Sequence, residues 1–311
     1  MRTVTWEAPG VLSLELRHPG GGELPPFTAG AHIDTHLPGE MTRSYSLINA
    51  QEERDRYVIA VARDASSRGG SAHVHDAVRP GDMLDVSGPR NDFALAEDAP
   101  ATAMLAGGIG ITPMVSMVRR LHVLGRPWQL TYCARTRSGA AFLDDLRTLA
   151  ARSGGELRTN FDHEPGGTLL DVAGWVDAVP DGAHLYCCGP APMLRAFEEA
   201  ATQRPPSHVH LEHFGAVEAP AAEGGFTVHL ARRKRDVPVR PGQTILDALL
   251  AAKVPVDYSC SEGVCGTCEV AVLEGVPDHR DVVLSQSERA SNRSIMICCS
   301  GSKTQRLVLD L

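Results

Sequence analysis

The chain has 311 residues, of which 43% are hydrophobic and 22% are charged, and its formal net charge is −8. The length allows two or three domains, and the composition is that of an ordinary globular protein. The acidic balance argues against a nucleic-acid partner, which would need basic patches, but permits docking on a basic patch of another protein.

The eight cysteines are poorly placed for disulfide bonds, because Cys187 and Cys188 are adjacent and Cys299 directly follows Cys298. A reducing cytoplasm fits this pattern better than an oxidising compartment. The first residues lack the apolar core of a signal peptide, and no run of eighteen apolar residues could span a membrane. We therefore expect a cytoplasmic protein that does not bind membranes.

Residues 4–86 contain short runs in which apolar and polar residues alternate, interrupted by Pro and Gly. Residues 11–16 and 31–37 show the period of two that is typical of half-buried strands. Many short strands with such breaks predict an antiparallel β-barrel. One helix is predicted at residues 71–78, and Pro80 and Gly81 end it.

Two short segments of this region could bind a phosphate-bearing ligand. Arg-Ser-Tyr-Ser at residues 43–46 offers a guanidinium that can bind phosphate through two hydrogen bonds and a ring that can lie against a flat ligand. Ser-Arg-Gly-Gly-Ser at residues 67–71 places glycines before a helix N-terminus, which favours anion binding. The plainer alternatives are a strand with an exposed arginine and a simple helix cap by Ser71.

From Thr102 onward, strand-like runs alternate with helical ones, which predicts a doubly wound parallel sheet. Strands are expected at residues 102–106, 128–133, near 157, at 184–187 and at 209–211. Helices are expected at residues 112–124, 140–151 and 191–202.

Two glycine-containing segments follow strands of this predicted sheet. Gly-Gly-Ile-Gly-Ile-Thr-Pro at residues 107–113 joins a strand to a helix, where glycine lets the backbone approach a pyrophosphate. It is not the G-x-G-x-x-G fingerprint, and a glycine-rich turn without ligand is the alternative. Cys-Gly-Pro at residues 188–190 ends a later strand. Cys188 is not predicted as a nucleophile, because nothing nearby in the sequence offers an activating base.

Residues 215–225 are small and acidic and contain Pro and Gly, which predicts a linker. Beyond it, strands are predicted at residues 226–230 and 268–273, and a helix at residues 245–252. The basic run at residues 232–235 is interpreted as a solvated hairpin tip, with docking of a partner as the alternative.

The last third carries the most specific chemical pattern of the chain. Cys260, Cys265 and Cys268 have the spacing C-x4-C-x2-C, and Cys298 follows after twenty-nine further residues. This is the plant-type spacing for the four thiolate ligands of a 2Fe–2S cluster, and glycines between the ligands let one tight loop fold around the inorganic core. Zinc or disulfides are the alternatives, but zinc knuckles favour two separated C-x2-C pairs. Cys299 is interpreted as packing, with replacement of a ligand as its alternative role.

These motifs, in this order, resemble those of the phthalate dioxygenase reductase family, which includes vanillate O-demethylase reductases. The resemblance covers nearly the whole chain and implies a multidomain protein. It implies an antiparallel β-barrel flavin domain at residues 1–98 and an α/β nicotinamide domain with a doubly wound parallel sheet at residues 99–214. After the linker at residues 215–225, it implies an α+β ferredoxin domain of the β-grasp type at residues 226–311.

The resemblance also implies how the first domain binds its cofactor. Residues 43–46 resemble the R-x-Y-S flavin motif, in which Arg43 binds the phosphate, Tyr45 lies against the isoalloxazine and Ser46 hydrogen-bonds the flavin edge. Residues 67–71 and the string Pro-Arg-Asn-Asp-Phe at residues 89–93 look like FMN-type members, so FMN is expected rather than FAD. The cofactor-binding residues expected here are Arg43, Ser44, Tyr45, Ser46, Ala60, Ala62, Gly69, Gly70 and Ser71.

In the second domain, residues 107–113 are similar to the G-x-G-x-T-P pattern of the family, and residues 188–193 resemble its C-G-P-x-x-M pattern. Phe214 resembles the aromatic residue that covers the flavin face, with a core phenylalanine as an equal alternative. No basic cluster marks a 2′-phosphate pocket, so NADH is expected rather than NADPH. The expected cofactor-binding residues are Gly108, Gly110, Thr112, Pro113, Arg135, Asp162, Cys188, Gly189, Pro190, Met193 and Phe214, with Ser46, Thr112 and Cys188 at the site of hydride transfer.

Hydride from NADH carries two electrons together, whereas an iron–sulfur cluster accepts one at a time, and a flavin can do both. The three binding patterns therefore predict an oxidoreductase that passes electrons from NADH through FMN and a 2Fe–2S cluster to another protein. The family implies a Rieske-type oxygenase or O-demethylase as that partner. A cytochrome P450 or another monooxygenase is the alternative acceptor, and a redox carrier or sensor without catalysis is the alternative class. We expect a monomer.

Overall fold

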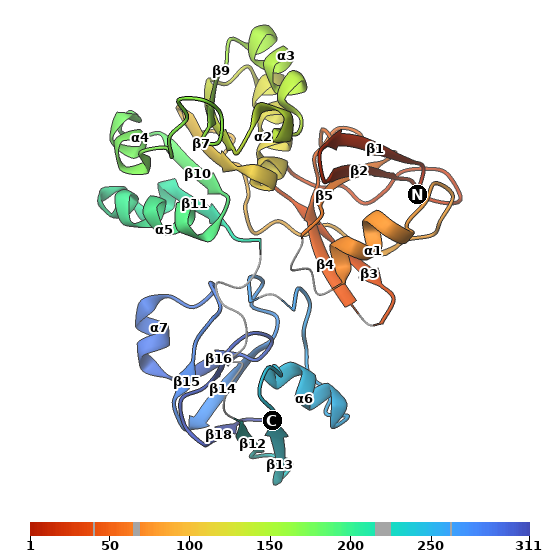
Figure 1. The fold of residues 1–311 in the computed structure, drawn as a ribbon, viewed down its shortest axis with the longest axis vertical. Helices are drawn as coiled ribbons and strands as arrows, with labels where there is room; N and C mark the ends of the chain where they lie inside the picture. Colours follow the sequence, from red (N-terminus) through yellow and green to blue (C-terminus); the bar gives the residue numbers. More distant parts are fainter. Residues whose placement is uncertain (40, 65–68, 215–224, 262) are drawn as a thin grey trace. The chain divides into compact units, whose positions relative to one another are not determined.

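The computed structural model describes residues 1–39, 41–64, 69–214, 225–261 and 263–311 (Figure 1). The chain divides into two compact units, Met1–Glu212 and His213–Leu311. Of the predicted linker at residues 215–225, only Gly225 belongs to the described residues. Ser67 and Arg68 of the predicted anion turn also lie outside them.

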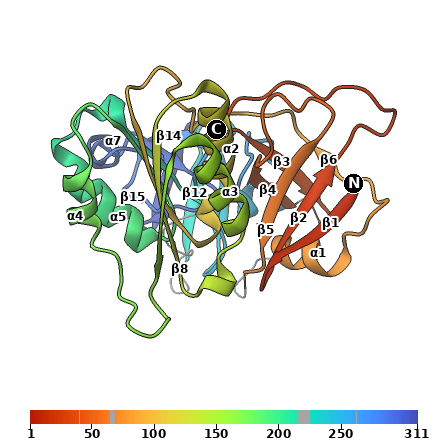
Figure 2. The same cartoon turned by 90° about the horizontal axis from the view of Figure 1, so that it is seen from above.

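The first unit begins with two three-stranded antiparallel sheets, which Figure 2 shows beside each other. One has the strand order β1-β2-β5, and the other has the order β4-β3-β6. An isolated bridge between Leu47 and Ile59 connects them, which confirms the barrel-like arrangement but divides it into two sheets. The elements are β1 (Thr3–Ala8), β2 (Val11–Leu16), β3 (His32–Leu37), β4 (Met41–Ser46), β5 (Tyr57–Ala62), α1 (Gly70–Ala77) and β6 (Asp85–Val86).

The rest of the first unit is a five-stranded, fully parallel sheet with the order β11-β10-β7-β8-β9. This confirms the predicted doubly wound sheet. The chain starts at the central β7, builds outward through β8 and β9, and returns to the other side of β7 with β10, so the strand order reverses between β7 and β10. Ligands of such sheets bind at the carboxyl ends of the strands flanking this reversal.

The strands are β7 (Thr102–Gly107), β8 (Trp128–Ala134), β9 (Glu156–Phe161), β10 (His184–Cys188) and β11 (Val209–Glu212). The helices are α2 (Ile111–Leu124), α3 (Leu143–Ser153), α4 (Val172–Ala178) and α5 (Ala191–Ala200). Short 3-10 turns lie at η1 (Gly108–Gly110), η2 (Arg137–Gly139), η3 (Ala201–Gln203) and η4 (Pro206–His208).

Two helical predictions need correction. The helix expected at residues 140–151 begins at Leu143, because Phe142 adopts a left-handed conformation (φ 62°) and turns its ring into the core. The helix expected at residues 191–202 ends at Ala200 and continues as a 3-10 turn. The short helix α4 was not predicted; it is stabilised by Asp171, whose side chain accepts a hydrogen bond from the Gly174 N–H.

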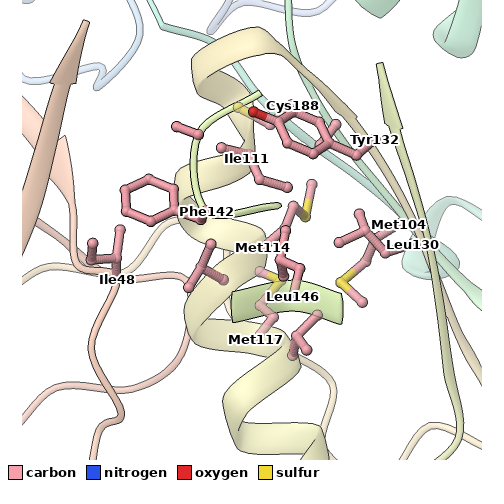
Figure 3. Packing of buried hydrophobic residues seen from close by; sticks show 14 of the residues in the cluster. Ile48, Met104, Ile111, Met114, Met117, Leu130, Tyr132, Phe142, Leu146 and Cys188 are labelled. Atoms are coloured by element: carbon pink, nitrogen blue, oxygen red, sulfur yellow. The ribbon is translucent and has the colours of Figure 1, made fainter. Parts of the chain in front are cut away.

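One hydrophobic core joins the antiparallel sheets to the parallel sheet. Met114 and Met117 of α2 are fully buried, and Figure 3 shows them between Ile48 and the side chains of Met104 and Leu130. The Gly30 N–H also donates to Ser116 Oγ of α2 (3.1 Å). Each large side chain buried in this way contributes about 1.5–3 kcal/mol. The core therefore fixes the first 100 residues of the chain rigidly against α2.

The second unit is built on a five-stranded mixed sheet with the order β13-β12-β18-β14-β16, in which β12 and β18 run parallel. This confirms the predicted α+β ferredoxin-type domain. Lys234 (φ 48°) turns the hairpin between β12 and β13, so the basic run does form its tip. The elements are β12 (Phe226–Leu230), β13 (Arg235–Val239), α6 (Ile245–Ala251), β14 (Glu269–Glu274), β15 (Pro277–Asp278), α7 (Gln286–Ser291), β16 (Ser294–Met296), β17 (Gly301–Ser302) and β18 (Arg306–Leu309).

Candidate cofactor sites

The two glycine motifs of the parallel sheet touch each other where the strand order reverses. A Cβ atom on Gly110 would lie 2.2 Å from the carbonyl oxygen of Cys188, and one on Gly107 would lie 2.6 Å from Cδ of Pro190. A Cβ on Gly189 would lie 2.8 Å from Sδ of Met193. Only glycine allows these two backbone segments to pack so closely. The sequence-predicted Gly110, Cys188, Gly189, Pro190 and Met193 are thereby brought to one place.

The start of α2 follows directly from this contact. Gly108 has a positive φ of 55°, and the 3-10 turn over Gly108–Gly110 leads into the helix. Thr112 is buried, and its hydroxyl donates to the Ile109 carbonyl (3.0 Å), which leaves its lone pairs for a further donor. Pro113 stands in the first turn, where a missing N–H leaves no hydrogen bond unmade. A helix N-terminus here favours a pyrophosphate.

Cys188 and Glu212 are paired at the ends of neighbouring parallel strands, β10 and β11. Cys188 is fully buried, and this burial raises the pKa of its thiol well above the usual value; the charges of Glu212 and Cys187 raise it further. The thiol is therefore neutral at physiological pH. This agrees with the interpretation that Cys188 does not act as a nucleophile.

Glu212 is a candidate that sequence reasoning missed. The residue as a whole is half-buried, but its Oε2 is inaccessible and has no hydrogen-bond partner in the described part of the chain. Burial raises the pKa of its carboxyl to about 8, with a smaller contribution from the charge of Asp92. Perturbed, unpartnered carboxyls of this kind are concentrated at functional sites. Glu212 is identified by its pairing with Cys188 on the neighbouring strand, and this strand register cannot be read from the sequence alone.

Arg43 and the N-terminus of α1 form a candidate anion site. A Cβ atom on Gly70 would lie 2.7 Å from Nε of Arg43, so the guanidinium crosses the first residue of the helix. Gly69, with φ 102°, precedes α1 and supplies no side-chain cap. Ser71 Oγ instead accepts from the Asp64 N–H (3.2 Å), and α1 has no side-chain cap hydrogen bond. A guanidinium beside helix N–H groups is suited to a terminal phosphate.

The other residues of the predicted flavin motif differ in their hydrogen bonds and in their burial. Ser44 donates to Oδ1 of the buried Asp34 (2.6 Å), and Tyr45 is half-buried against the sheet core. Ser46 is only 4% exposed, and its Oγ has no hydrogen-bond partner among the described residues. A buried hydroxyl without a partner is what a polar ring edge of a flavin would satisfy. The residues present therefore fit the expected group.

Five further predicted residues contribute less specific observations. Ala60 and Ala62 lie on β5, paired with Ser13 and Val11 of β2, and offer only backbone groups. Arg135 and Asp162 follow β8 and β9, where the Asp162 N–H donates to the Ala134 carbonyl (3.3 Å), so both stand at the carboxyl edge of the sheet. Phe214 is 44% exposed and belongs to the second unit.

The second unit gathers the four predicted cluster cysteines. The Cys265 thiol lies within hydrogen-bonding reach of Cys260, and the Cys298 thiol reaches both Cys260 and Cys268. Three of the four are buried and Cys265 is half-buried. Four soft sulfur donors are the ligand set of iron–sulfur clusters. Among the described residues, no group of three or more His, Cys, Asp or Glu side chains is arranged to hold a metal ion.

Gly263 and Cys299 explain how the cysteine loop packs. Gly263 has a positive φ of 72°, and a Cβ atom there would lie 2.5 Å from Sγ of the buried Cys299. Cys299 therefore fills the space beneath the loop, in line with its interpretation as a packing residue. None of the eight cysteines, all of which lie in the described residues, forms a disulfide bond. As far as the described residues go, no helix combines the length and apolar character needed to cross a membrane.

Comparisons with known proteins agree with this division of the chain. Residues 228–302 match the family model of the 2Fe-2S iron-sulfur cluster binding domain, and residues 104–199 match that of the oxidoreductase NAD-binding domain. The chain is 56% identical to the phenoxybenzoate dioxygenase subunit beta of Ectopseudomonas oleovorans, covering 100% of this chain and 96% of the relative. It is 48% identical to the tetrachlorobenzoquinone reductase of Sphingobium chlorophenolicum, and the match covers 99% of this chain and 96% of that relative.

A solved structure matches over nearly the whole chain. The structure of phthalate dioxygenase reductase, described as modular for electron transfer from pyridine nucleotides to 2Fe-2S, has a TM-score of 0.82. The sequence identity is 38%, and the match covers 99% of this chain and 96% of that one.

Replacing Gly110 by Ala is expected to weaken NADH binding at least about tenfold and to destabilise the first unit by about 1–3 kcal/mol, because the new Cβ must push the end of β10 away from α2. Titration with NAD+ and thermal unfolding measure the two effects. Gly88→Ala is the matched control, since a Cβ there meets nothing within 4 Å. Unchanged binding in Gly110→Ala would contradict the assignment.

The buried Glu212 carboxyl predicts a pH-dependent stability. Between its ordinary pKa of 4.5 and about 8, the folded protein keeps a proton that the unfolded chain has lost. Stability must therefore fall as the pH rises through this window, by at most about 1.4 kcal/mol per pH unit. Glu212→Gln removes this titration. The melting temperature of the variant, relative to that of the wild type, should therefore rise as the pH increases from about 5 to about 8.

Release of flavin fluorescence on heating reports unfolding of the first unit. The exposed Glu198 of α5 provides the control Glu198→Gln, which should follow the wild type at every pH. Parallel curves for the wild type and Glu212→Gln would show that Glu212 is not buried in its neutral form.

Proposed function

The chain belongs to the phthalate dioxygenase reductase family, and on this basis we propose that it is the NADH-dependent reductase component of an oxygenase system. The observation that carries the proposal is the convergence of Cys260, Cys265, Cys268 and Cys298 in the same chain as the nucleotide and flavin motifs. The electrons pass from NADH to FMN, then to the 2Fe–2S cluster, and then to a partner protein. Residues 1–98 are assigned to FMN, residues 99–214 to NADH and residues 226–311 to the 2Fe–2S cluster.

In the first unit, one set of residues binds FMN and another set binds NADH. Arg43 and the N-terminus of α1 hold the FMN phosphate, Tyr45 lies against the ring system, and the unpartnered Ser46 hydroxyl contacts its edge. The segment from Gly108 to Gly110 and the N-terminus of α2 hold the pyrophosphate of NADH. A bound flavin supplies the conversion between a two-electron hydride donor and a one-electron acceptor.

Two polar groups next to the expected hydride-transfer site, Cys188 and Glu212, carry no full charge at neutral pH. The Cys188 thiol is neutral because it is buried, and the Glu212 carboxyl holds a proton up to about pH 8. Neutral groups here avoid a fixed negative charge that would repel an electron-rich ring. The contact of Gly110 with Cys188 leaves no room for solvent between the two motifs.

The acceptor is proposed to be a terminal oxygenase or O-demethylase of the Rieske type. The net charge of −8 suits docking on a basic surface of such a protein. A plant-type cluster lies near −400 mV and Rieske centres lie at about −150 to +300 mV, so the transfer is downhill. Cysteines that form no disulfide bond suit a reducing cytoplasm, and we propose that the protein is a monomer there.

One relative supports a second acceptor. Because the 48% identical protein is named tetrachlorobenzoquinone reductase, a quinone is the second candidate acceptor. Reconstitution separates the possibilities: NADH oxidation by the purified protein is measured with a Rieske oxygenase, a cytochrome P450 or tetrachlorobenzoquinone present. Fast turnover with the quinone and none with any oxygenase would replace the first proposal by the second.

Replacing Cys265 by Ser is expected to reduce NADH-dependent cytochrome c reduction at least about tenfold, because hydroxyl is a poor ligand for iron and the one-electron exit is lost. Ferricyanide reduction should change less than about twofold, since ferricyanide can take electrons from the flavin. The two rates are measured on one preparation, and its visible spectrum reports the cluster. Equal loss with both acceptors would contradict the assigned order of electron transfer.

A further inference from the structure

We propose that Asp281 is a positioning residue that joins the two cysteine-bearing segments of the second unit and holds them at the spacing a cluster requires. The inference rests on the proposed function, because it takes the four cysteines as cluster ligands. Asp281 lies outside the cysteine motif and in neither of the segments that carry the ligands. Its role emerges only from the contacts its backbone and side chain make.

The Asp281 carboxylate is 0% exposed, and both of its oxygens are engaged. Oδ2 accepts hydrogen bonds from the backbone N–H groups of Val283 (3.1 Å) and Leu284 (2.8 Å). Oδ1 accepts from the hydroxyl of Ser300 (3.4 Å). A buried carboxylate costs several kcal/mol unless it is hydrogen-bonded, so these contacts hold the surrounding backbone in place.

Ser300 connects Asp281 to the segment of the fourth cysteine. It is buried two residues after Cys298, and its Oγ also accepts from the Arg280 N–H (3.1 Å). The Ser300 N–H donates to the Met296 carbonyl (3.1 Å), which closes the turn that contains Cys298. Movement of Asp281 would therefore be transmitted to the turn that presents the Cys298 thiol.

On its other side, the Asp281 backbone supports the loop of the first three cysteines. The Val282 N–H donates to the Gly263 carbonyl (3.0 Å). A Cβ atom on Gly263 would lie 3.2 Å from Cα of Asp281 and 2.5 Å from Sγ of Cys299. The chain at residues 281–282 thus packs against the middle of the Cys260–Cys265 interval while its carboxylate reaches toward Cys298.

The charge of Asp281 is balanced by Arg289. Arg289 of α7 donates to the Asp281 carbonyl (2.5 Å), and its guanidinium lies 3.9 Å from Oδ2. Nδ1 of the half-buried His279 lies 3.8 Å from Oδ1, and burial lowers the pKa of this imidazole. The ion pair with Arg289 makes a carboxylate tolerable at this depth, and its negative charge close to the cysteine segments should tune the potential of a cluster there.

The test replaces Asp281 by Asn in the full-length holoprotein. Asn keeps the size but lacks the charge and one acceptor oxygen, so the Ser300 contact or the Val283 and Leu284 contacts must weaken. The ratio of iron to FMN is expected to fall at least twofold. Any cluster that remains should show altered electron paramagnetic resonance g values and a more positive midpoint potential. The ferricyanide rate should stay within twofold of the wild type, because the first unit does not contain Asp281.

Asp310→Asn is the matched control, since Asp310 forms a surface ion pair with Arg232 in the same unit. It should leave the iron content, the resonance spectrum and the potential unchanged. If Asp281→Asn shows the wild-type iron ratio, g values and potential, the inference is overturned while the proposed function stands. If the wild-type protein itself lacks a 2Fe–2S signal, the proposed function fails first.

If the Asp281→Asn variant cannot be purified, the Ser300→Ala variant tests the positioning role of Asp281 instead. This variant removes only the hydroxyl between Arg280 and Asp281, so the change to the fold is smaller. A lowered iron ratio or an altered resonance spectrum with unchanged FMN content supports the inference. Wild-type values for both overturn it.

Discussion

The close contact between the Gly107–Gly110 turn and the Cys188–Gly189 turn is the constraint on which the first unit depends. Two backbone segments from opposite sides of the strand reversal meet at distances that exclude a single methyl group. This contact places the N-terminus of α2 and the paired ends of β10 and β11 around one point. Because α2 also carries Met114 and Met117 into the core shared with the antiparallel sheets, the same helix fixes both nucleotide sites.

The cysteines of this chain show how environment sets the chemistry of one side chain. Burial among apolar neighbours keeps the Cys188 thiol neutral, which suits the position beside a nicotinamide that we propose for it. The thiols of Cys260, Cys268 and Cys298 are just as buried, but they face one another, so that iron can compensate their charge as thiolates. Cys299 is adjacent to the proposed ligand Cys298 and yet packs against Gly263. Sequence proximity to a ligand therefore does not determine function here.

The sequence predicted most of the fold because its signals are local. Strand alternation, the glycines before α2 and the spacing of Cys260, Cys265 and Cys268 each lie within about fifteen residues, and each describes one turn or one strand. Phe142 was placed wrongly, since its left-handed backbone reflects the demand of the core for its ring and not a local preference. Glu212 and Asp281 were missed for a related reason. Glu212 stands out only because it lies beside Cys188, and Asp281 only because it lies between Gly263 and Ser300. These neighbours are distant from them in the sequence.

The two units have separate cores, and this separation matters for how the protein works. Among the described residues, the core of the second unit is formed by residues from Phe226 onward, so the cysteine site can form without contributions from the flavin and nicotinamide sites. Hydride transfer needs two rings held rigidly against each other, because bond formation fails when the reacting atoms shift by about 1 Å. Transfer of single electrons needs no bond between the groups. A rigid first unit and an independently folded second unit therefore match the different geometric demands of the two steps.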